Sequence, residues 1–201
     1  MRAIIVTYPT PNNIQSLVNL TSEDYVIGVD QAVQYLKEQQ IKIDLAVGDF
    51  DSLENMDLLS DLDVVKLNPI KDNTDTSQAL YEAKKRGYKD IVLIGGFGGD
   101  RIEHFIAHLT HFNSYESLMM INENSTIYIK KEGHYTFTYD GYISFFGYPE
   151  ATISLTGFKY PLKAYQLTTF DALCISNELL SNAGELIVHH GAVLVVESYK
   201  K

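Results

Sequence analysis

The chain contains an acidic motif at residues 47–52, which reads Val-Gly-Asp-Phe-Asp-Ser. The motif follows the apolar run of residues 43–47, which predicts a short β-strand. Side chains two residues apart on an extended chain point the same way, so Asp49 and Asp51 should project together from the end of that strand. Two adjacent carboxylates repel each other unless protons or a cation neutralise them. The motif therefore indicates either a Mg²⁺ site, which bridges carboxylates to substrate phosphates, or a polar turn rich in Gly and Asp.

Strand and helix patterns alternate on both sides of this motif, throughout residues 1–122. Such alternation is typical of a mostly parallel α/β sheet, whose ligands lie beyond the carboxyl ends of the strands. We therefore expect an α/β domain over residues 1–122. The predicted strands are residues 3–8, 25–29, 43–47, 64–67, 90–94 and 118–121, and the predicted helices are residues 14–20, 31–39, 74–86 and 101–112.

The pattern changes in residues 123–201, which contain short β-branched or aromatic runs. Glycine-containing turn signals separate several of these runs, at residues 132–133, 140–141, 147–149 and 190–191. Short strands at this spacing predict an all-β antiparallel sandwich over residues 123–201. The predicted strands are residues 126–130, 135–139, 142–146, 151–155, 164–169, 172–175, 184–189 and 192–197.

The composition narrows the class of protein. The formal net charge is -10 and no long basic run is present, which argues against a nucleic acid or an anionic membrane as a partner. Cys174 is the only cysteine, so no internal disulfide can form, which fits a reducing cytoplasm. The apolar run near Met1 is too short for a signal peptide, and no run has the length of a membrane span. We therefore expect a cytoplasmic protein.

A second acidic motif, Lys-Asp-Asn-Thr-Asp at residues 71–75, begins just before the helix predicted at residues 74–86. Asp and Asn at a helix start ordinarily cap free N–H groups and complement the helix dipole. One cap needs one carboxylate, whereas this motif supplies Asp72 and Asp75 beside Lys71. Together with the first motif, these aspartates could hold Mg²⁺ on a polyphosphate, and Lys71 could balance the polyphosphate charge.

A glycine-rich segment at residues 95–99 joins a predicted strand to a predicted helix. A loop in that position can present backbone N–H groups to phosphate oxygens. The segment matches neither the Walker pattern nor the dinucleotide fingerprint. Arg101 lies at the helix start, where a cation is unfavourable unless an anion compensates it. A bidentate phosphate contact would provide that compensation.

Three histidines, at positions 104, 108 and 111, share one face of the same predicted helix. A zinc site is one interpretation of this spacing. Surface or packing positions are the other interpretation for His108 and His111, because no cysteine or His-Glu-x-x-His element accompanies them.

Asp30 and Tyr160 admit two interpretations each, and Ser176 and Asn177 admit one. Asp30 ends the strand predicted at residues 25–29, and it either caps the next helix or belongs to a site. Tyr160 is either a core or rim aromatic or a platform for a ligand. Ser176 and Asn177 ordinarily indicate a loop after a strand.

Four motifs in fixed order resemble the thiamine pyrophosphokinase family. They are Val-Gly-Asp-Phe-Asp-Ser at 47–52, Lys-Asp-x-Thr-Asp at 71–75, a Gly-Gly…Arg-x-x-His segment at 98–104, and Ser-Asn-Glu at 176–178. The resemblance implies an N-terminal α/β domain that binds ATP and Mg²⁺, a C-terminal β-sandwich that binds thiamine, and a homodimer with active sites at the subunit interface. It also implies Mg²⁺-dependent transfer of pyrophosphate from ATP to the hydroxyl of thiamine, with thiamine diphosphate and AMP as products.

The same resemblance implies roles for individual residues. Catalytic positions are implied for Asp49, Asp51, Asp72, Asp75 and Arg101, and the four aspartates are also implied as metal ligands. ATP contacts are implied for Asp30, Lys71, Asp75, Gly98, Gly99, Arg101 and His104. Thiamine contacts are implied for Tyr160, Ser176 and Asn177. The chain departs from the family pattern at four positions. Gln31 replaces a glycine, Glu103 replaces an aspartate, Tyr160 replaces a tryptophan, and Asp100 is an insertion before the arginine.

Two other functions would use the same aspartates. A metal-dependent nucleotide phosphohydrolase would direct water at ATP and would need no thiamine. A non-catalytic nucleotide sensor would bind ATP without turnover. The Ser-Asn-Glu motif at residues 176–178 lies far from the aspartates in sequence and favours a second substrate over both alternatives.

Overall fold

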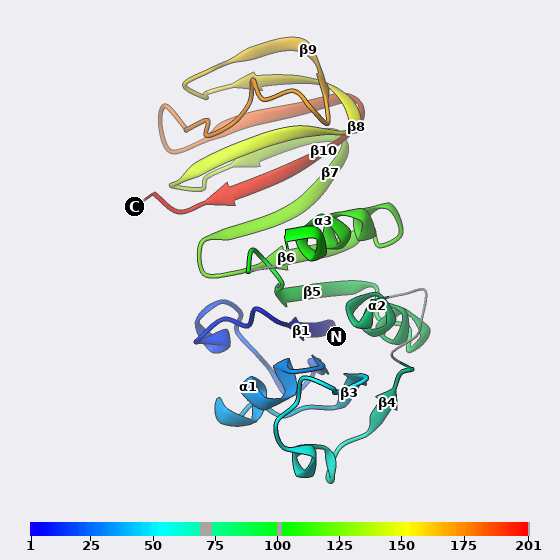
Figure 1. Cartoon of the computed structure of the whole chain (residues 1–201). Coiled ribbons are helices and arrows are strands. Elements are labelled where there is room, and N and C mark those ends of the chain that lie inside the picture. Colours follow the sequence, from blue (N-terminus) through cyan, green and yellow to red (C-terminus); the bar gives the residue numbers. More distant parts are fainter. Residues whose placement is uncertain (69–73, 100–101, 201) are drawn as a thin grey trace. The chain divides into compact units, whose positions relative to one another are not determined.

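The computed structural model describes residues 1–68, 74–99 and 102–200, and divides into two compact units, Met1–Glu123 and Asn124–Lys201 (Figure 1). None of the described helices combines the length and apolar character that a membrane span requires. The elements of the first unit are β1 (Ala3–Thr7), a 3₁₀ turn (Ile14–Ser16), β2 (Tyr25–Val29), α1 (Ala32–Glu38), β3 (Leu45–Gly48), a 3₁₀ helix (Met56–Leu59), β4 (Val64–Lys66), α2 (Asp75–Lys85), β5 (Asp90–Gly95), α3 (Ile102–Thr110), a 3₁₀ turn (His111–Asn113) and β6 (Ser117–Ile121).

The first unit is an α/β fold with a parallel sheet, as the sequence predicts. The strand order is β4-β3-β2-β1-β5-β6, and each of these pairings is parallel. The chain builds outward from β1 through β2, β3 and β4, then returns to the other side of β1 to add β5 and β6. The strand order therefore reverses between β1 and β5, where Thr7 pairs with Gly95. In open sheets such a reversal is where ligands bind.

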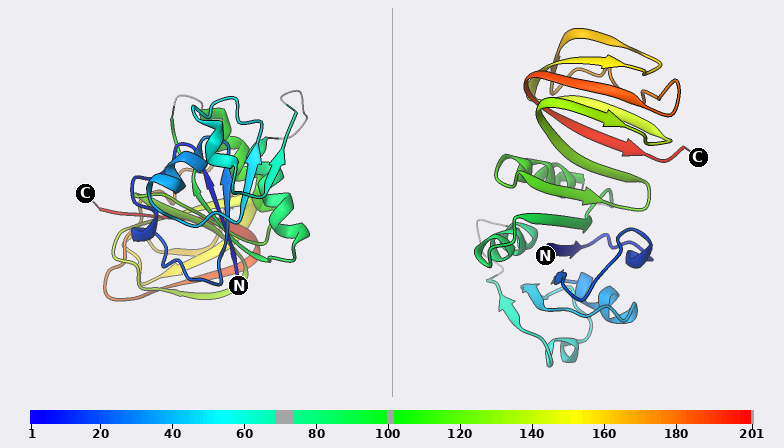
Figure 2. Two further views of the ribbon diagram at one scale, coloured as in Figure 1. Left: turned by 90° about the horizontal axis from the view of Figure 1, so that it is seen from below. Right: turned by 180° about the vertical axis from the view of Figure 1, so that it is seen from behind.

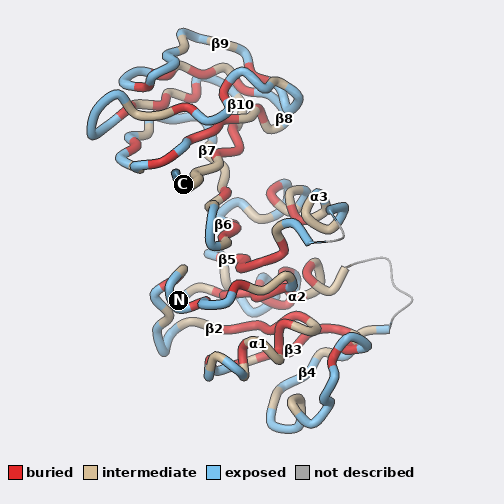
Figure 3. The backbone as a smooth tube through the Cα atoms, turned by 60° about the vertical axis from the view of Figure 1, so that its left-hand side comes forward, coloured by how far each residue is buried: buried red, intermediate tan, exposed pale blue. Residues whose placement is uncertain are grey.

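Continuous apolar runs explain why these strands occupy the centre of the unit. Every residue of β1 and β3 is buried, and β2 and β5 are buried at every residue except the first. Figure 3 shows these buried residues in red. Helix α1 packs so closely on β2 that a Cβ added at Gly28 would lie 3.0 Å from Val33 Cγ2. Glycine at that position therefore sets the distance between helix and sheet.

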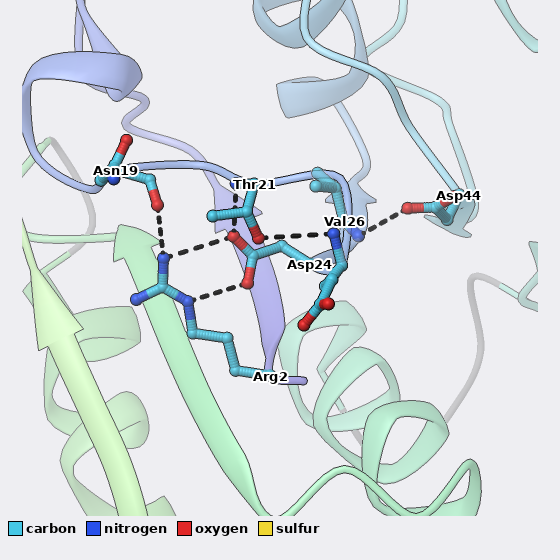
Figure 4. Close-up of polar contacts among 7 residues, drawn as sticks. Arg2, Asn19, Thr21, Asp24, Val26 and Asp44 are labelled. Carbon is cyan, nitrogen blue, oxygen red and sulfur yellow. Dashed lines mark hydrogen bonds and ion pairs between the residues drawn. The ribbon is translucent and has the colours of Figure 1, made fainter.

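An ion pair fixes the amino ends of β1 and β2 (Figure 4). Arg2 contacts the Asp24 carboxylate with two nitrogens, at 2.9 and 3.3 Å, and donates to the Asn19 carbonyl at 2.8 Å. Burial raises the pKa of Asp24, but the hydrogen bonds from Arg2 and Thr21 outweigh it, so the pKa is lowered. Asp44 similarly accepts from the Val26 N–H at 2.9 Å. These contacts lie at the strand ends opposite the carboxyl ends and hold the sheet together.

The second unit is an antiparallel β-structure of four described strands in the order β7-β10-β8-β9. They are β7 (Ser125–Phe137), β8 (Tyr142–Thr156), β9 (Leu162–Thr168) and β10 (Gly184–Ser198). Three of them are long and curve strongly (Figure 2). Their pairing shifts register near residues 132, 148–150 and 189–191, which allows each strand to bend there. Both halves of the bent strands then bury side chains in one core, which includes Phe145, Ile153 and Leu186.

The predicted β-sandwich is thus confirmed, but the predicted division into strands is partly wrong. The runs predicted on either side of residues 132–133, 147–149 and 190–191 belong to single strands, because the glycines there sit at bulges inside paired strands. Only the signal at residues 140–141 separates two strands. No strand forms at residues 172–175, where one was predicted, because residues 173–176 form a turn, and residues 14–20 contain one 3₁₀ turn where a helix was predicted.

Candidate active site

The carboxyl ends of the central strands surround a cavity of about 500 Å³ in the first unit. A cavity of this size suits a small-molecule ligand. It lies where the strand order reverses, because its walls include the segments that follow β1, β2 and β5 and the first turn of α2. The lining residues are Thr7, Tyr8, Pro9, Val29, Asp30, Gln31, Ser52, Thr74, Asp75, Thr76, Gly96, Gly98, Gly99 and His104.

Three aspartates at the edge of this cavity form a group that we call the acidic trio: Asp30, Asp49 and Asp51. One carboxylate oxygen from each lies within 4.8 Å of the others. Backbone geometry brings them together. The Asp30 N–H donates to the Val47 carbonyl at 2.9 Å, which joins the end of β2 to the end of β3. A Cβ at Gly48 would lie 3.1 Å from the Asp30 Cα, so glycine permits this close approach.

Asp30 is the most constrained member of the trio. Its backbone is left-handed, with φ 47°, and it does not occupy the N-cap position of α1, which belongs to Gln31. Its Oδ1 is buried and has no hydrogen-bond partner. Burial raises the Asp30 pKa, and the nearby charges of Asp75, Asp49 and Asp51 raise it further. A buried carboxylate oxygen without a donor, beside like charges, is what a hard divalent cation would satisfy.

Asp75 reaches the same cavity from the start of α2. Thr74 provides the N-cap of this helix by accepting from the Ser77 N–H at 3.1 Å, so the capping role belongs to a threonine. Thr76, which follows Asp75, is buried, and its hydroxyl lies 3.2 Å from the Thr7 hydroxyl at the end of β1. This contact anchors the first turn of α2 beside β1, and Asp75 therefore faces the cavity together with Asp30.

The glycine-rich loop after β5 adopts a backbone that side chains rarely permit. Gly95, Gly96, Gly98 and Gly99 all have positive φ, between 69° and 85°. Gly98 and Gly99 line the cavity, and a Cβ at Gly98 would meet nothing within 4 Å. A Cβ at Gly96, by contrast, would lie 2.7 Å from His108 Nε2. The loop is thus packed at Gly96 and, against Pro9, at Gly99, where a Cβ would lie 2.8 Å from Pro9 Cγ, and it is open at Gly98.

The three histidines of α3 separate into different roles. His104 lines the cavity, whereas His108 is 2% exposed under Gly96. Burial, and then the proximity of His111 and His104, lowers the pKa of His108 to about 4, so this imidazole is neutral at pH 7. Within the described part of the chain, the acidic trio is the one group with metal-binding spacing, and these histidines form none. The packing interpretation therefore holds for His108.

Several predicted residues cannot be placed. Lys71, Asp72 and Arg101 lie outside the described residues. In the second unit, Tyr160 is 56% exposed and Asn177 is 1% exposed, and the two are joined by hydrogen bonds.

Sequence reasoning missed several cavity residues at the end of β1. Thr7, Tyr8 and Pro9 line the cavity, as do Ser52 and Thr76. The signal for the first three was available, because β1 is a predicted strand and parallel strands place their ligands at their carboxyl ends. Neutral side chains in this position carry no charge pattern that would have singled them out.

Comparisons with known proteins agree with this architecture. A family model described as "Thiamin pyrophosphokinase, catalytic domain" matches residues 17–123, and one described as "Thiamin pyrophosphokinase, vitamin B1 binding domain" matches residues 124–192. The chain is 31% identical to a thiamine pyrophosphokinase of Bacillus subtilis, over 98% of this chain and 99% of that protein.

Solved structures of similar proteins share the fold. The crystal structure of thiamine pyrophosphokinase from Bacillus subtilis is 27% identical, with a TM-score of 0.84 and full coverage of both chains. That of thiamin pyrophosphokinase from Geobacillus thermodenitrificans is 28% identical, with a TM-score of 0.84, covering 100% of this chain and 99% of that one. The chain belongs to the thiamin pyrophosphokinase family.

Proposed function

We propose that this chain transfers the terminal pyrophosphate of ATP to the hydroxyethyl oxygen of thiamine and releases thiamine diphosphate and AMP. The acidic trio carries this proposal, because it stands beside a cavity lined by a left-handed glycine loop. Transfer of this type needs positioning and charge neutralisation more than covalent help. In this proposal residues 1–122 form the catalytic domain for ATP and Mg²⁺, and residues 123–201 form the domain for thiamine.

Carboxylates would hold Mg²⁺ at this site. In the trio, Asp49 and Asp51 are the metal ligands that the sequence predicts. Asp30 is a further candidate ligand, because its Oδ1 is buried and has no hydrogen-bond partner. Asp75 lines the same cavity, and we include it with Asp72 among the proposed metal and catalytic residues. When bound, Mg²⁺ supplies positive charge that offsets the negative charge of the polyphosphate.

The remaining residues would bind and orient ATP. The loop lines the cavity at Gly98 and Gly99 and is open at Gly98, so backbone N–H groups there can meet phosphate oxygens. His104 lies in the wall of the same cavity. We assign phosphate contacts to Lys71 and Arg101 as well, because a chain of net charge -10 needs placed cations to bind a polyanion.

Thiamine, a cation, would be attracted by the acidic surplus of the chain. We propose that Tyr160, Ser176 and Asn177 form the thiamine-binding part of the site. We also propose a cytoplasmic homodimer, in which these residues complete the active site of the other subunit.

The decisive experiment incubates the purified protein with ATP, Mg²⁺ and thiamine and measures AMP and thiamine diphosphate. Thiamine-dependent formation of both in equal amounts is expected, and Asp49→Asn should abolish it. Glu54→Gln is a matched control, because Glu54 is an exposed carboxylate outside the trio. Phosphate release without thiamine would instead identify a phosphohydrolase, and ATP binding without any product would identify a nucleotide sensor.

A further inference from the structure

Residues 176–180 are anchored on both sides within the second unit. Asn177 pairs with Ile143 of β8 through two backbone hydrogen bonds, of 2.8 and 3.0 Å. Two residues later, Leu179 forms a bridge with Phe158, which is fully buried. The segment is therefore held between the start of β8 and the chain near residue 158.

The side chain of Asn177 is buried and directed to the backbone of Tyr160. Its Nδ2 donates to the Tyr160 carbonyl at 2.9 Å, and its Oδ1 accepts from the Tyr160 N–H at 3.1 Å. The same Oδ1 also accepts from the Glu178 N–H at 3.0 Å. One amide thus satisfies both backbone polar groups of Tyr160. With 1% of the residue exposed, Asn177 presents almost no surface to a ligand.

Tyr160 combines a fixed backbone with an exposed ring. The residue is 56% exposed, although its neighbour Phe158 is fully buried. The Lys159 ammonium lies 5.7 Å from the ring centroid and is paired with Glu178 at 3.3 Å. The ring therefore projects from a segment whose backbone is held at two successive residues, because the Lys159 N–H donates to the Glu178 carbonyl at 2.8 Å and Asn177 holds both polar groups of Tyr160. An aromatic group held this way binds a flat ligand with less loss of conformational entropy.

We propose that Asn177 is a positioning residue: it acts on thiamine by holding the Tyr160 backbone and does not itself contact thiamine. This inference rests on the proposed function, in which the Tyr160 ring meets thiamine. It differs from the direct contact that the family resemblance implies for Asn177.

A double-mutant cycle in the full-length protein tests how Asn177 acts. Asn177→Ala and Tyr160→Ala are each expected to raise the thiamine KM about tenfold, the range for a cation on an aromatic ring, with the ATP KM unchanged. If Asn177 acts through the ring, the double variant should match Tyr160→Ala alone. Multiplied effects, near a hundredfold, would show direct contact and overturn the proposal. If Asn177→Ala does not fold, Asn177→Asp replaces it, since aspartate keeps the size but sets an oxygen against the Tyr160 carbonyl.

A second measurement tests the contact without any substrate. The chain has no tryptophan, so Tyr160→Trp introduces a single tryptophan, which can be excited selectively over the tyrosines. Adding Asn177→Asp should increase the fast component of its fluorescence anisotropy decay. Glu178→Gln should leave the decay unchanged, because it keeps the Asn177 amide and the backbone hydrogen bond from the Lys159 N–H to the Glu178 carbonyl. Equal decay with and without Asn177→Asp would overturn the proposal.

Thiamine quenching of the same reporter separates this proposal from the proposed function. Quenching is expected in the Tyr160→Trp protein and should need more thiamine after Asn177→Asp. Absence of quenching, with an anisotropy change still present, would refute thiamine binding at Tyr160 while leaving the amide contact established.

Discussion

Replacing Asp30 by asparagine should separate the electrostatic cost of the acidic trio from its ability to bind a cation. Asparagine has the same size and tolerates the left-handed backbone found at this position, φ 47°. It removes one negative charge from three that share a space of 4.8 Å. We expect Asp30→Asn to be more stable than the wild type without Mg²⁺ and to gain much less stability when Mg²⁺ is added.

The magnitude follows from the spacing of the charges. Two like charges about 4 Å apart repel by about 4 kcal/mol near a protein surface and by about 1 kcal/mol in water. Because Asp51 is exposed and Asp49 is partly buried, we expect a net gain in unfolding free energy toward the lower value, about 1–2 kcal/mol. For a chain of this size that gain raises Tm by about 2–8 °C. Wild-type protein with Mg²⁺ at about 100 times its Kd should gain about 2.7 kcal/mol, or about 5–11 °C.

The assay is thermal unfolding followed by circular dichroism, first with a chelator and then across a Mg²⁺ titration. Glu54→Gln removes an exposed charge outside the trio and should behave like the wild type in both conditions. A Tm of Asp30→Asn below that of the wild type without Mg²⁺ would refute the electrostatic argument. An undiminished Mg²⁺-induced rise in the variant would refute the assignment of Asp30 as a ligand.

Three further perturbations test other features of the two units. Burial lowers the pKa of His108 from 6.5 to about 4, so between these two pH values the unfolded state binds more protons than the folded state. As the pH falls through this range, the free energy of unfolding should decrease by up to about 1.4 kcal/mol per pH unit. Urea titrations should show a smaller decrease for His108→Gln. Gly96→Ala should destabilise the protein by about 1–3 kcal/mol more than Gly98→Ala, since both have similar positive φ but only position 96 lacks room; equal Tm values would contradict this. If active sites are shared between subunits, co-expression of Asp75→Asn with Tyr160→Ala should give, at limiting thiamine, more activity than either variant alone, by about a quarter of the wild-type value. No recovery in verified mixed dimers would place the site in one chain.

Much of the first unit could be predicted because its signals are local. The central strands are continuous apolar runs, as buried parallel strands require, and α2 carries its own cap at Thr74 and stop at Gly87. The same signals predicted several residues that line the cavity. Asp30, Asp75, Gly98, Gly99 and His104 come from separate stretches, yet they line one cavity because they follow the carboxyl ends of β2, β4 and β5, which are parallel strands of one sheet.

Only the tertiary structure decided the second unit's strands and the use of its polar side chains. Gly133, Gly147 and Gly191 carry the same local signal as Gly141, but pairing with β10 or β8 makes the first three part of long strands. Asn177 reads as a loop residue in sequence, yet its amide is buried against Tyr160, 17 positions away. Local patterns record backbone preference and residue chemistry, whereas register and burial depend on which distant segments meet, and that is settled by packing of the whole core.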